Sequence, residues 1–324
     1  MDIKSIHHYF LKCNSVSIDT RKIEPGSLFV AIKGDIFDAN TFAKEALEKG
    51  ASFVIIDNPK YFIDDRTVVV EDSLNTLQEL AKYHRDYLNI PIVALTGSNG
   101  KTTTKELIQV VLAKKFNTKA TFGNLNNHIG VPLTLLSFTK DTEVGIVEMG
   151  ANHQKEIEFL CEIAKPDFGY ITNFGKAHLE GFGGVEGVIQ GKSELYQFLA
   201  KNSGVCLINS ADSKQVAGTL NQEIFSFGTS SSATVTIQDI DRGADENIVI
   251  LAEETKIISQ LKGTYNFTNI AAAVAFGNYF EIPIAKIKKG IAVGTEIPER
   301  QRYGNVGQWA QNQLTENGYN INSI

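Results

Sequence analysis

The sequence predicts an α/β protein: a small amino-terminal α/β domain followed by a larger central domain with a mostly parallel sheet flanked by helices. Along most of the 324 residues, short apolar runs alternate with helical segments, which is typical of parallel sheets. One apolar run, 92–95, is followed by a Gly-rich turn and then by a helix, the arrangement of an anion-binding loop. A chain of this length is expected to hold about two domains.

The amino-terminal unit, residues 1–88, is predicted to contain three short strands and two helices. The predicted strands are 27–32, 52–56 and 67–70. The predicted helices are 41–49, which Gly50 ends, and 73–88, for which Ser73 is a good N-cap. Two polar turns, 17–22 and 33–40, lie at strand ends and carry carboxylates, hydroxyls and basic groups. On these residues alone, both turns are interpreted as solvated loops.

The central unit, residues 89–297, begins after a boundary near 89–91. Its predicted strands are 92–95, 144–147, 168–172 and 205–208, its predicted helices are 101–111, 154–163, 185–200 and 265–280, and 229–256 is a predicted β insertion with strands at 235–240 and 247–254. Ligands of parallel sheets bind outside the carboxyl ends of the strands. The turn after 92–95, Glu148, Asn173 and Asn209 each follow a strand, so we expect them to converge on one crevice.

The turn after the first central strand has the composition of a phosphate-binding loop, so the central unit is predicted to be a P-loop domain. The turn contains Thr96, Gly97, Ser98, Asn99 and Gly100, and the next helix opens with Lys101, Thr102 and Thr103. Glycines let the backbone approach phosphates closely, and a helix start attracts anions. The Lys101 ammonium would neutralise phosphate charge, and the Thr102 hydroxyl could bind Mg²⁺. Leu95 stands where the full motif has glycine, so the shorter G-x-x-G-K-T indicates a nucleotide phosphate without indicating a reaction.

Three further residues are candidates either for a metal site or for ordinary roles. Glu148 ends a strand beside the loop, where it could contact Mg²⁺ or serve as an N-cap or surface acid. His178 lies among glycines, and a lone histidine is often structural or exposed. Lys192 would repel a nearby magnesium ion as an ammonium, whereas a neutral amine can take up CO₂ as a carbamate with oxygen ligands. A solvated lysine is the default interpretation.

Charge and composition exclude several classes of protein. The net charge of −6 and the pI near 5.6 argue against a nucleic-acid-binding surface, which needs a basic stripe. No apolar stretch is long enough to span a bilayer, and the amino-terminal segment lacks the apolar core of a signal peptide. Cys13, Cys161 and Cys206 fit no C-x-x-C spacing, so plain thiols are expected. The sequence therefore predicts a cytoplasmic protein without membrane insertion or nucleic-acid partners.

Several motifs in a fixed order make the chain resemble the Mur ligase family. Residues 17–42 resemble the family's uridine-nucleotide domain. The matching central stretches are TGSNGKTTTKEL (96–107), GNLNNHIGVPLTLL (123–136), EMGANH (148–153), TNFGKAHLEGFGG (172–184), GKSE (191–194) and GTYNFTNIAAA (263–273). The resemblance covers residues 1 to about 296. NLNNHIGVPLTLL and EMGANH are most similar to the members that add D-alanyl-D-alanine.

The resemblance implies a role for each matching residue. The implied catalytic and metal-binding set is Lys101, Thr102, Glu148, His178 and carbamylated Lys192, with Lys101 and Thr102 on the β- and γ-phosphates of ATP, Glu148 on a first Mg²⁺ and His178 and Lys192 on a second. The implied nucleotide contacts also include residues 96–100, Thr103, Asn266 and Asn269, the last on adenine, while Tyr265 replaces the family's usual histidine. The implied substrate contacts are Ser17, Asp19, Thr20, Arg21 and Asp38, with Asn127 and His128 on the acyl-acceptor side.

The implied activity is ATP-dependent ligation in peptidoglycan precursor synthesis, by a monomer. ATP would phosphorylate the terminal carboxylate of UDP-MurNAc-tripeptide, and the amine of D-Ala-D-Ala would then attack the acyl phosphate. The alternatives are a sibling ligase (the diamino-acid-adding enzyme or folylpolyglutamate synthase), a non-catalytic UDP-sugar- or ATP-binding fragment, and a generic P-loop kinase or ATPase. The turns at 17–22 and 33–40 argue against the folate enzyme, and NLNN and GKSE argue against a generic kinase.

Residues 298–324 depart from the family pattern. They are polar, rich in Gln and Asn and without apolar periodicity, which predicts a disordered tail or a truncated end. They do not resemble the third domain with which Mur ligases continue. Closure of that domain excludes water from the site, so the sequence predicts weaker ATP binding and little or no ligation by this chain.

Overall fold

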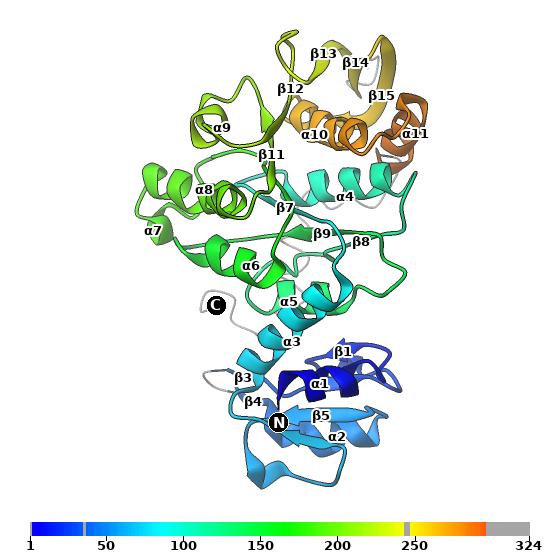
Figure 1. Cartoon of the computed structure of the whole chain (residues 1–324), viewed down its shortest axis with the longest axis vertical. Helices are drawn as coiled ribbons and strands as arrows, with labels where there is room; N and C mark the ends of the chain where they lie inside the picture. Colours follow the sequence, from blue (N-terminus) through cyan, green and yellow to red (C-terminus); the bar gives the residue numbers. More distant parts are fainter. Residues whose placement is uncertain (1, 35–36, 243–246, 296–324) are drawn as a thin grey trace.

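The computed structural model describes residues 2–34, 37–242 and 247–295 (Figure 1). Two α/β bodies lie along the long axis of the molecule, and helix α3 (Ser73–Leu88) runs from the lower body towards the upper one. The predicted fold class is confirmed, because helices flank a mostly parallel central sheet. The predicted tail, 298–324, lies outside the described residues.

The amino-terminal body is a four-stranded parallel sheet with helices on both faces. Its elements are α1 (Ile3–Phe10), β1 (Val16–Ser17), β2 (Leu28–Val30), β3 (Lys33–Gly34), β4 (Phe37–Asp38), α2 (Ala43–Glu48), β5 (Phe53–Ile56), β6 (Thr67–Val69) and α3. The sheet order is β1-β2-β5-β6, and β3 and β4 form a separate antiparallel ribbon. Because successive strand residues face opposite sides, Leu28 and Val30 pack with α1 and α3, whereas Phe29 packs with α2.

The central body is built on a nine-stranded sheet. Its strands are β7 (Ile92–Thr96), β8 (Thr118–Ala120), β9 (Val144–Glu148), β10 (Phe168–Ile171), β11 (Val205–Asn209), β12 (Ile224–Gly228), β13 (Val235–Arg242), β14 (Asn247–Ala252) and β15 (Thr255–Lys262). Its helices are α4 (Lys101–Leu112), α5 (Gly130–Leu136), α6 (Glu156–Ala164), α7 (Leu179–Phe182), α8 (Val185–Lys201), α9 (Ser213–Gly218), α10 (Asn266–Tyr279) and α11 (Ile284–Thr295). The order is β15-β14-β13-β12-β11-β10-β7-β9-β8. Only the pairings among β13, β14 and β15 are antiparallel within the described sheet.

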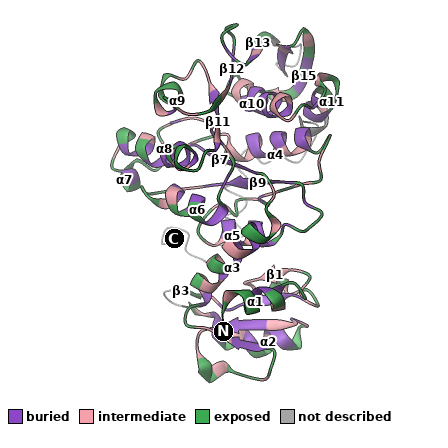
Figure 2. Ribbon diagram, viewed as in Figure 1, coloured by how far each residue is buried: buried purple, intermediate pink, exposed green. Residues whose placement is uncertain are grey.

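Strand β7 shows why the central strands are continuously apolar. Val93 and Leu95 lie in a cluster with side chains of α4, α10 and α11, whereas Ile92 and Ala94 lie in a cluster with side chains of α5, α6 and α8. Both faces of the strand are therefore buried (Figure 2), which is typical of parallel sheets covered by helices. This packing fixes the carboxyl end of β7, where the Gly-rich turn begins.

Helix α3 fixes the amino-terminal body to the central one. The buried guanidinium of Arg85 donates to the carbonyl oxygens of Ala164 and Lys165, both at 3.0 Å, at the end of α6. It also pairs with the carboxylate of Asp167 at 3.0 Å. A cation at a helix carboxyl end is favoured by the helix dipole. The apolar cluster of α1 and α3 continues into that of α5 and α6, so the two bodies share a core.

The structure corrects several predicted elements. The N-cap of α3 is Asp72, whose carboxylate accepts from the N–H of Asn75 at 2.7 Å, and Ser73 is the first helical residue. The segment just before Val185, for which no helix was predicted, contains α7. Strand β15 follows the two predicted insertion strands. The elements that the sequence patterns did not predict are α1, β1, β3, β4, β8, α5, α9, β12 and α11.

Two predicted absences can be compared with the structure. All three cysteines are free thiols. In the part of the chain that the structure describes, no helix has both the length and the apolar character needed to cross a membrane.

Candidate nucleotide and metal site

Two glycines shape the turn between β7 and α4. The φ angle is 146° at Gly97 and 77° at Gly100, and both values favour glycine over other residues. A Cβ atom on Gly97 would lie 1.9 Å from Oγ1 of Thr172, and one on Gly100 would lie 2.6 Å from Oδ1 of Asn269. The turn therefore packs against its neighbours as closely as a bare backbone allows.

Residues after β10 hold this turn from the side. The Ser98 hydroxyl donates to the carbonyl oxygen of Gly175 at 2.7 Å. The Asn173 side chain accepts from the N–H of Asn99 at 3.2 Å and donates to its carbonyl oxygen at 2.9 Å. The Thr172 hydroxyl donates to the same oxygen at 2.6 Å. The predicted convergence of the turn and Asn173 is confirmed.

Asn209 was predicted to join the same crevice, and the structure shows no contact between it and the turn among the described residues. Its strand, β11, is separated from β7 by β10. The Asn209 side chain accepts from the N–H of Ala211 at 3.0 Å and so stabilises its own turn.

Lys101 folds back over the Gly-rich turn. Its Nζ donates to the carbonyl oxygen of Gly97 at 2.9 Å. Burial lowers the pKa of Lys101, and the charge of Glu148 partly opposes this shift. Thr102 and Thr103 follow on the half-buried first turn of α4. No described side chain caps this helix, which suits an anion at its amino end.

The predicted nucleotide contacts Thr96, Asn266 and Asn269 are buried beneath the turn. The Oδ1 atom of Asn269 accepts from the Thr104 hydroxyl at 3.0 Å, and its Nδ2 donates to Oδ1 of Asn266 at 2.8 Å. The Asn269 side chain is therefore engaged within the protein, where it supports the turn at Gly100. A contact of Asn269 with adenine stays a prediction.

A buried carboxylate ends the strand next to β7. Glu148 is 1% exposed, and its Oε1 accepts from Nδ2 of Asn126 at 2.9 Å. Its Oε2 has no hydrogen-bond partner among the described residues, although the Nζ of Lys105 lies 4.0 Å away. Buried polar atoms rarely lack a partner in folded proteins. A buried carboxylate oxygen without a hydrogen-bond partner is suited to bind magnesium.

Lys192 and His178 lie near Lys101, the residue that follows the Gly-rich turn. Lys192 in α8 is 1% exposed, and its Nζ lies 5.3 Å from the centroid of the Phe182 ring. Burial, followed by the charge of Lys101, lowers the pKa of Lys192 to about 8. His178 is exposed at its surface, but partial burial of its ring lowers its pKa, and the charges of Lys192 and Lys101 lower that pKa further. These like-charge effects indicate that His178, Lys192 and Lys101 lie close to one another.

The protein oxygen atoms at this site could bind a metal ion only if further ligands, such as nucleotide phosphates, completed the site. Among the residues that the structure describes, no three His, Cys, Asp or Glu side chains form a metal-binding cluster. Glu148 and the Thr102 hydroxyl are oxygen donors of the kind Mg²⁺ prefers, and nucleotide phosphates commonly complete such sites. Lys192 fits as a ligand only after carbamylation, and a pKa of about 8 makes the neutral amine that this reaction requires more abundant than it is for an ordinary lysine.

The residues predicted to bind the UDP-linked substrate lie in two turns of the amino-terminal body. The Asp19 carboxylate pairs with Arg21 at 2.8 Å and caps its own 3-10 turn, in which Thr20 also lies. The Ser17 hydroxyl donates to the Asp19 carbonyl oxygen at 2.9 Å. Asp38 caps the 3-10 turn before α2. The first turn follows β1, at a carboxyl end where ligands of parallel sheets bind, and the second follows the β3–β4 ribbon.

Asn127 and His128 lie on the turn before α5. The Asn127 side chain accepts from the N–H of Gly130 at 2.9 Å, and the His128 carbonyl oxygen accepts from the side chain of Gln78 at 3.0 Å. Their neighbour Asn126, which the sequence analysis did not single out, is the residue that contacts Glu148.

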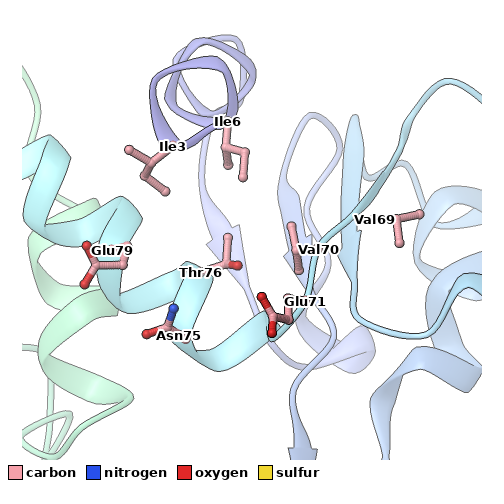
Figure 3. A pocket seen from close by; sticks show the side chains of 8 residues that line it. All are labelled: Ile3, Ile6, Val69, Val70, Glu71, Asn75, Thr76 and Glu79. Carbon is pink, nitrogen blue, oxygen red and sulfur yellow. The ribbon is translucent and has the colours of Figure 1, made fainter. Parts of the chain in front are cut away.

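A separate pocket of about 370 Å³ opens between α1, the end of β6 and the start of α3 (Figure 3). Its lining residues are Ile3, Ile6, Val69, Val70, Glu71, Asn75, Thr76 and Glu79. The residues predicted to bind the substrate do not line it.

Sequence analysis also missed two buried charged groups beside the candidate site. Lys105 follows Lys101 by four residues, so the two lie on one face of α4, and this spacing was the available signal. Glu194, in the GKSE stretch, accepts from the N–H groups of Lys155 at 2.6 Å and Glu158 at 3.0 Å, and thereby caps α6. No sequence pattern indicates that contact, because the cap comes from a different helix.

The fold and the turn after β7 define a P-loop nucleotide-binding protein. Residues 95–277 match the Mur ligase middle domain, and residues 12–88 match the domain described as Mur ligase family, catalytic domain. The chain belongs to the Mur ligase family.

Its relatives include two ligases with the same full description, UDP-N-acetylmuramoyl-tripeptide–D-alanyl-D-alanine ligase. The Bacillus subtilis protein is 35% identical over 282 residues, which are 86% of this chain and 61% of the relative. The Escherichia coli protein is 35% identical over 317 residues, which are 95% of this chain and 69% of the relative. The chain therefore spans between three fifths and about seven tenths of the length of these relatives.

Solved structures give the same relationship. A crystal structure of MurF from Acinetobacter baumannii has a TM-score of 0.78 and 30% identity, and the match covers 92% of this chain and 69% of that one. MurF from Thermotoga maritima in complex with ADP has a TM-score of 0.73 and 29% identity, with 86% and 66% covered.

Proposed function

We propose that this chain is an ATP-dependent ligase that adds D-Ala-D-Ala to UDP-MurNAc-tripeptide, through an acyl phosphate. The proposal assigns substrate binding to residues 1–88 and nucleotide binding to 89–297, in a monomeric cytoplasmic protein. Two relatives are named for this activity, and a similar solved structure is that of a MurF protein.

One observation carries the proposal most directly. The P-loop lysine, Lys101, opens the helix that follows β7, and Glu148 ends the adjacent parallel strand β9 as a buried carboxylate whose Oε2 has no hydrogen-bond partner among the described residues. Phosphoryl transfer depends on charge neutralisation and in-line positioning more than on a covalent protein group. This pair supplies a cation for phosphate and an oxygen ligand for magnesium.

The remaining residues divide the work of binding. The Lys101 ammonium holds the β- and γ-phosphates, and the amino end of α4 favours their charge. Thr102 and Glu148 would hold one Mg²⁺, and His178 and carbamylated Lys192 a second, which would neutralise charge on the transferred phosphoryl group. Ser17, Asp19, Thr20, Arg21 and Asp38 would hold the UDP-linked substrate, and Asn127 and His128 would lie near its acyl end.

A phosphate-release assay with ATP and UDP-MurNAc-tripeptide, with and without D-Ala-D-Ala, tests the proposal. We expect release that depends on D-Ala-D-Ala but is slow, in keeping with the weak ligation that the sequence predicts for a chain spanning 61% of a matched relative. Lys101→Ala should abolish it, because it removes the cation that folds over the P-loop, whereas Lys119→Ala, on the exposed face of β8, should retain it.

Other results would point to the alternatives. Nucleotide and UDP-sugar binding without any phosphate release would favour a non-catalytic binding protein. Release that depends on a diamino acid and not on D-Ala-D-Ala would favour the sibling ligase.

A further inference from the structure

Lys105 is a buried lysine that the proposed function leaves without a role. Its side chain is 0% exposed, one helical turn after Lys101 on α4. Its Nζ donates to the carbonyl oxygens of Thr121 at 2.6 Å and Gly123 at 3.2 Å. A lysine is almost never fully buried unless it is paired, so the contacts of this ammonium explain its position.

Two carboxylates balance the Lys105 charge. Glu106 lies 3.2 Å from its Nζ, and Oε2 of Glu148 lies 4.0 Å from it. The second distance is too long for a direct hydrogen bond but short enough for strong attraction in a buried setting. Lys105 therefore draws the Glu148 carboxylate towards α4 without occupying its free oxygen.

The segment that Lys105 holds also reaches Glu148. The Thr121 hydroxyl accepts from the backbone N–H of Glu148 at 2.9 Å. Three residues after Gly123, Nδ2 of Asn126 donates to Oε1 of Glu148 at 2.9 Å. Asn126 is itself fixed, because its carbonyl oxygen accepts from the N–H of Gly150 at 2.7 Å. Lys105 thus holds the start of the segment 121–126 and lies near Oε2 of Glu148, and Asn126, at the end of that segment, contacts Oε1.

We propose that Lys105 and Asn126 are positioning residues that orient the Glu148 carboxylate, so that Oε1 is engaged and Oε2 alone faces a magnesium ion. This inference rests on the proposed role of Glu148 at the nucleotide site. Groups that orient a metal ligand commonly set metal affinity, and their loss costs about 10- to 100-fold.

Calorimetric titration with ADP, in EDTA and across a series of Mg²⁺ concentrations, tests the inference. The variants are Lys105→Met, which keeps the length of the side chain without its charge, and Asn126→Ala. Lys119→Met is the matched control, because Lys119 is an exposed lysine just before the held segment. Thermal melting first establishes which variants fold.

We expect both variants to bind ADP in EDTA within about twofold of the parent protein, and to need about 10- to 100-fold more Mg²⁺ for half-maximal tightening. If Lys105→Met does not fold, the Mg²⁺ requirement of Asn126→Ala decides the outcome. Folded variants with the parent's Mg²⁺ dependence would overturn the inference while leaving the proposed function standing. A parent protein that binds no ADP would overturn both.

Discussion

Among single residues, Gly97 is the position where an added side chain should do most harm to the nucleotide site. Gly97→Ala would combine a left-handed backbone angle with a Cβ atom 1.9 Å from the Thr172 hydroxyl. We expect the free energy of unfolding to fall by about 1–3 kcal/mol and ADP binding to weaken, because the turn must move. Urea unfolding and calorimetry measure both effects.

Gly34→Ala is the control for that substitution, because an added Cβ atom there meets nothing within 4 Å. It should leave both quantities near those of the parent protein. A Gly97→Ala variant that behaves like Gly34→Ala would show that the turn is not held as closely as the structure indicates.

The sequence predicted the contiguous Gly-rich motif and its meeting with Asn173, but it did not predict most individual side-chain pairings between distant residues. Gly97, Gly100 and Lys101 form one contiguous motif, so their roles follow from order alone. Lys105 contacts oxygens 16 and 18 residues away, and no pattern in one sequence fixes such a pairing. Asn269 illustrates the same limit, because its partner Thr104 is 165 residues away.

Among the helices, α6 depends on a cap from another element. Glu194 of α8 accepts from two N–H groups at the start of α6. The N-cap residue of α6, Lys155, makes no capping hydrogen bond with its side chain. Glu194→Ala would leave two partly buried donors without this partner. We expect a loss of about 1–3 kcal/mol in the free energy of unfolding, measured by urea denaturation.

Glu162→Ala is the matched control on α6, because Glu162 is exposed. It should change the free energy of unfolding by no more than about 0.5 kcal/mol. Equal effects of the two substitutions would contradict the capping role of Glu194.

Elements were predictable where burial imposes a pattern over many residues. β7, β9, β10 and β11 are buried on both faces, and their continuous apolar runs predicted them. Helices α5, α7 and α9 have 7, 4 and 6 residues, which is too short for a helical period to stand out. The N-cap of α3 was placed one residue too late because Asp72 and Ser73 are both good caps.

For the molecule as a whole, a buried histidine pair near the junction of the two bodies should confer acid sensitivity. Nε2 of His7 lies 3.0 Å from Nδ1 of His84, and Nε2 of His84 lies 3.0 Å from the carbonyl oxygen of Phe138. If both rings are neutral, each can donate one hydrogen bond along this chain. Burial, together with His84, lowers the pKa of His7 to about 4, and burial lowers that of His84.

The sign of the pH effect follows from these depressed values. The unfolded chain takes up protons near its ordinary histidine pKa of 6.5, whereas folded His7 does so only near pH 4. The contribution of this pair to stability should therefore be constant above about pH 7 and fall as the pH drops from 6.5 towards 4. His7 alone would account for a loss of about 3 kcal/mol in the free energy of unfolding over this range.

Urea unfolding between pH 7.5 and about pH 4.5 measures this dependence. His7→Phe should flatten the acid limb, whereas His8→Asn, at an exposed position of the same helix, should leave it unchanged. The same slope in His7→Phe and in the parent protein would exclude the histidine pair as its source.

The most direct test of the proposed ligase chemistry follows oxygen from substrate to phosphate. The terminal carboxylate of UDP-MurNAc-tripeptide is labelled with ¹⁸O, and the purified chain is incubated with ATP, Mg²⁺ and D-Ala-D-Ala. In the proposed reaction, a carboxylate oxygen attacks the γ-phosphorus and ADP leaves. The amine then attacks the carbonyl carbon, and phosphate leaves with that oxygen. Mass spectrometry should find one ¹⁸O in the phosphate for each amide bond formed. Unlabelled phosphate released together with ligated product would contradict the account.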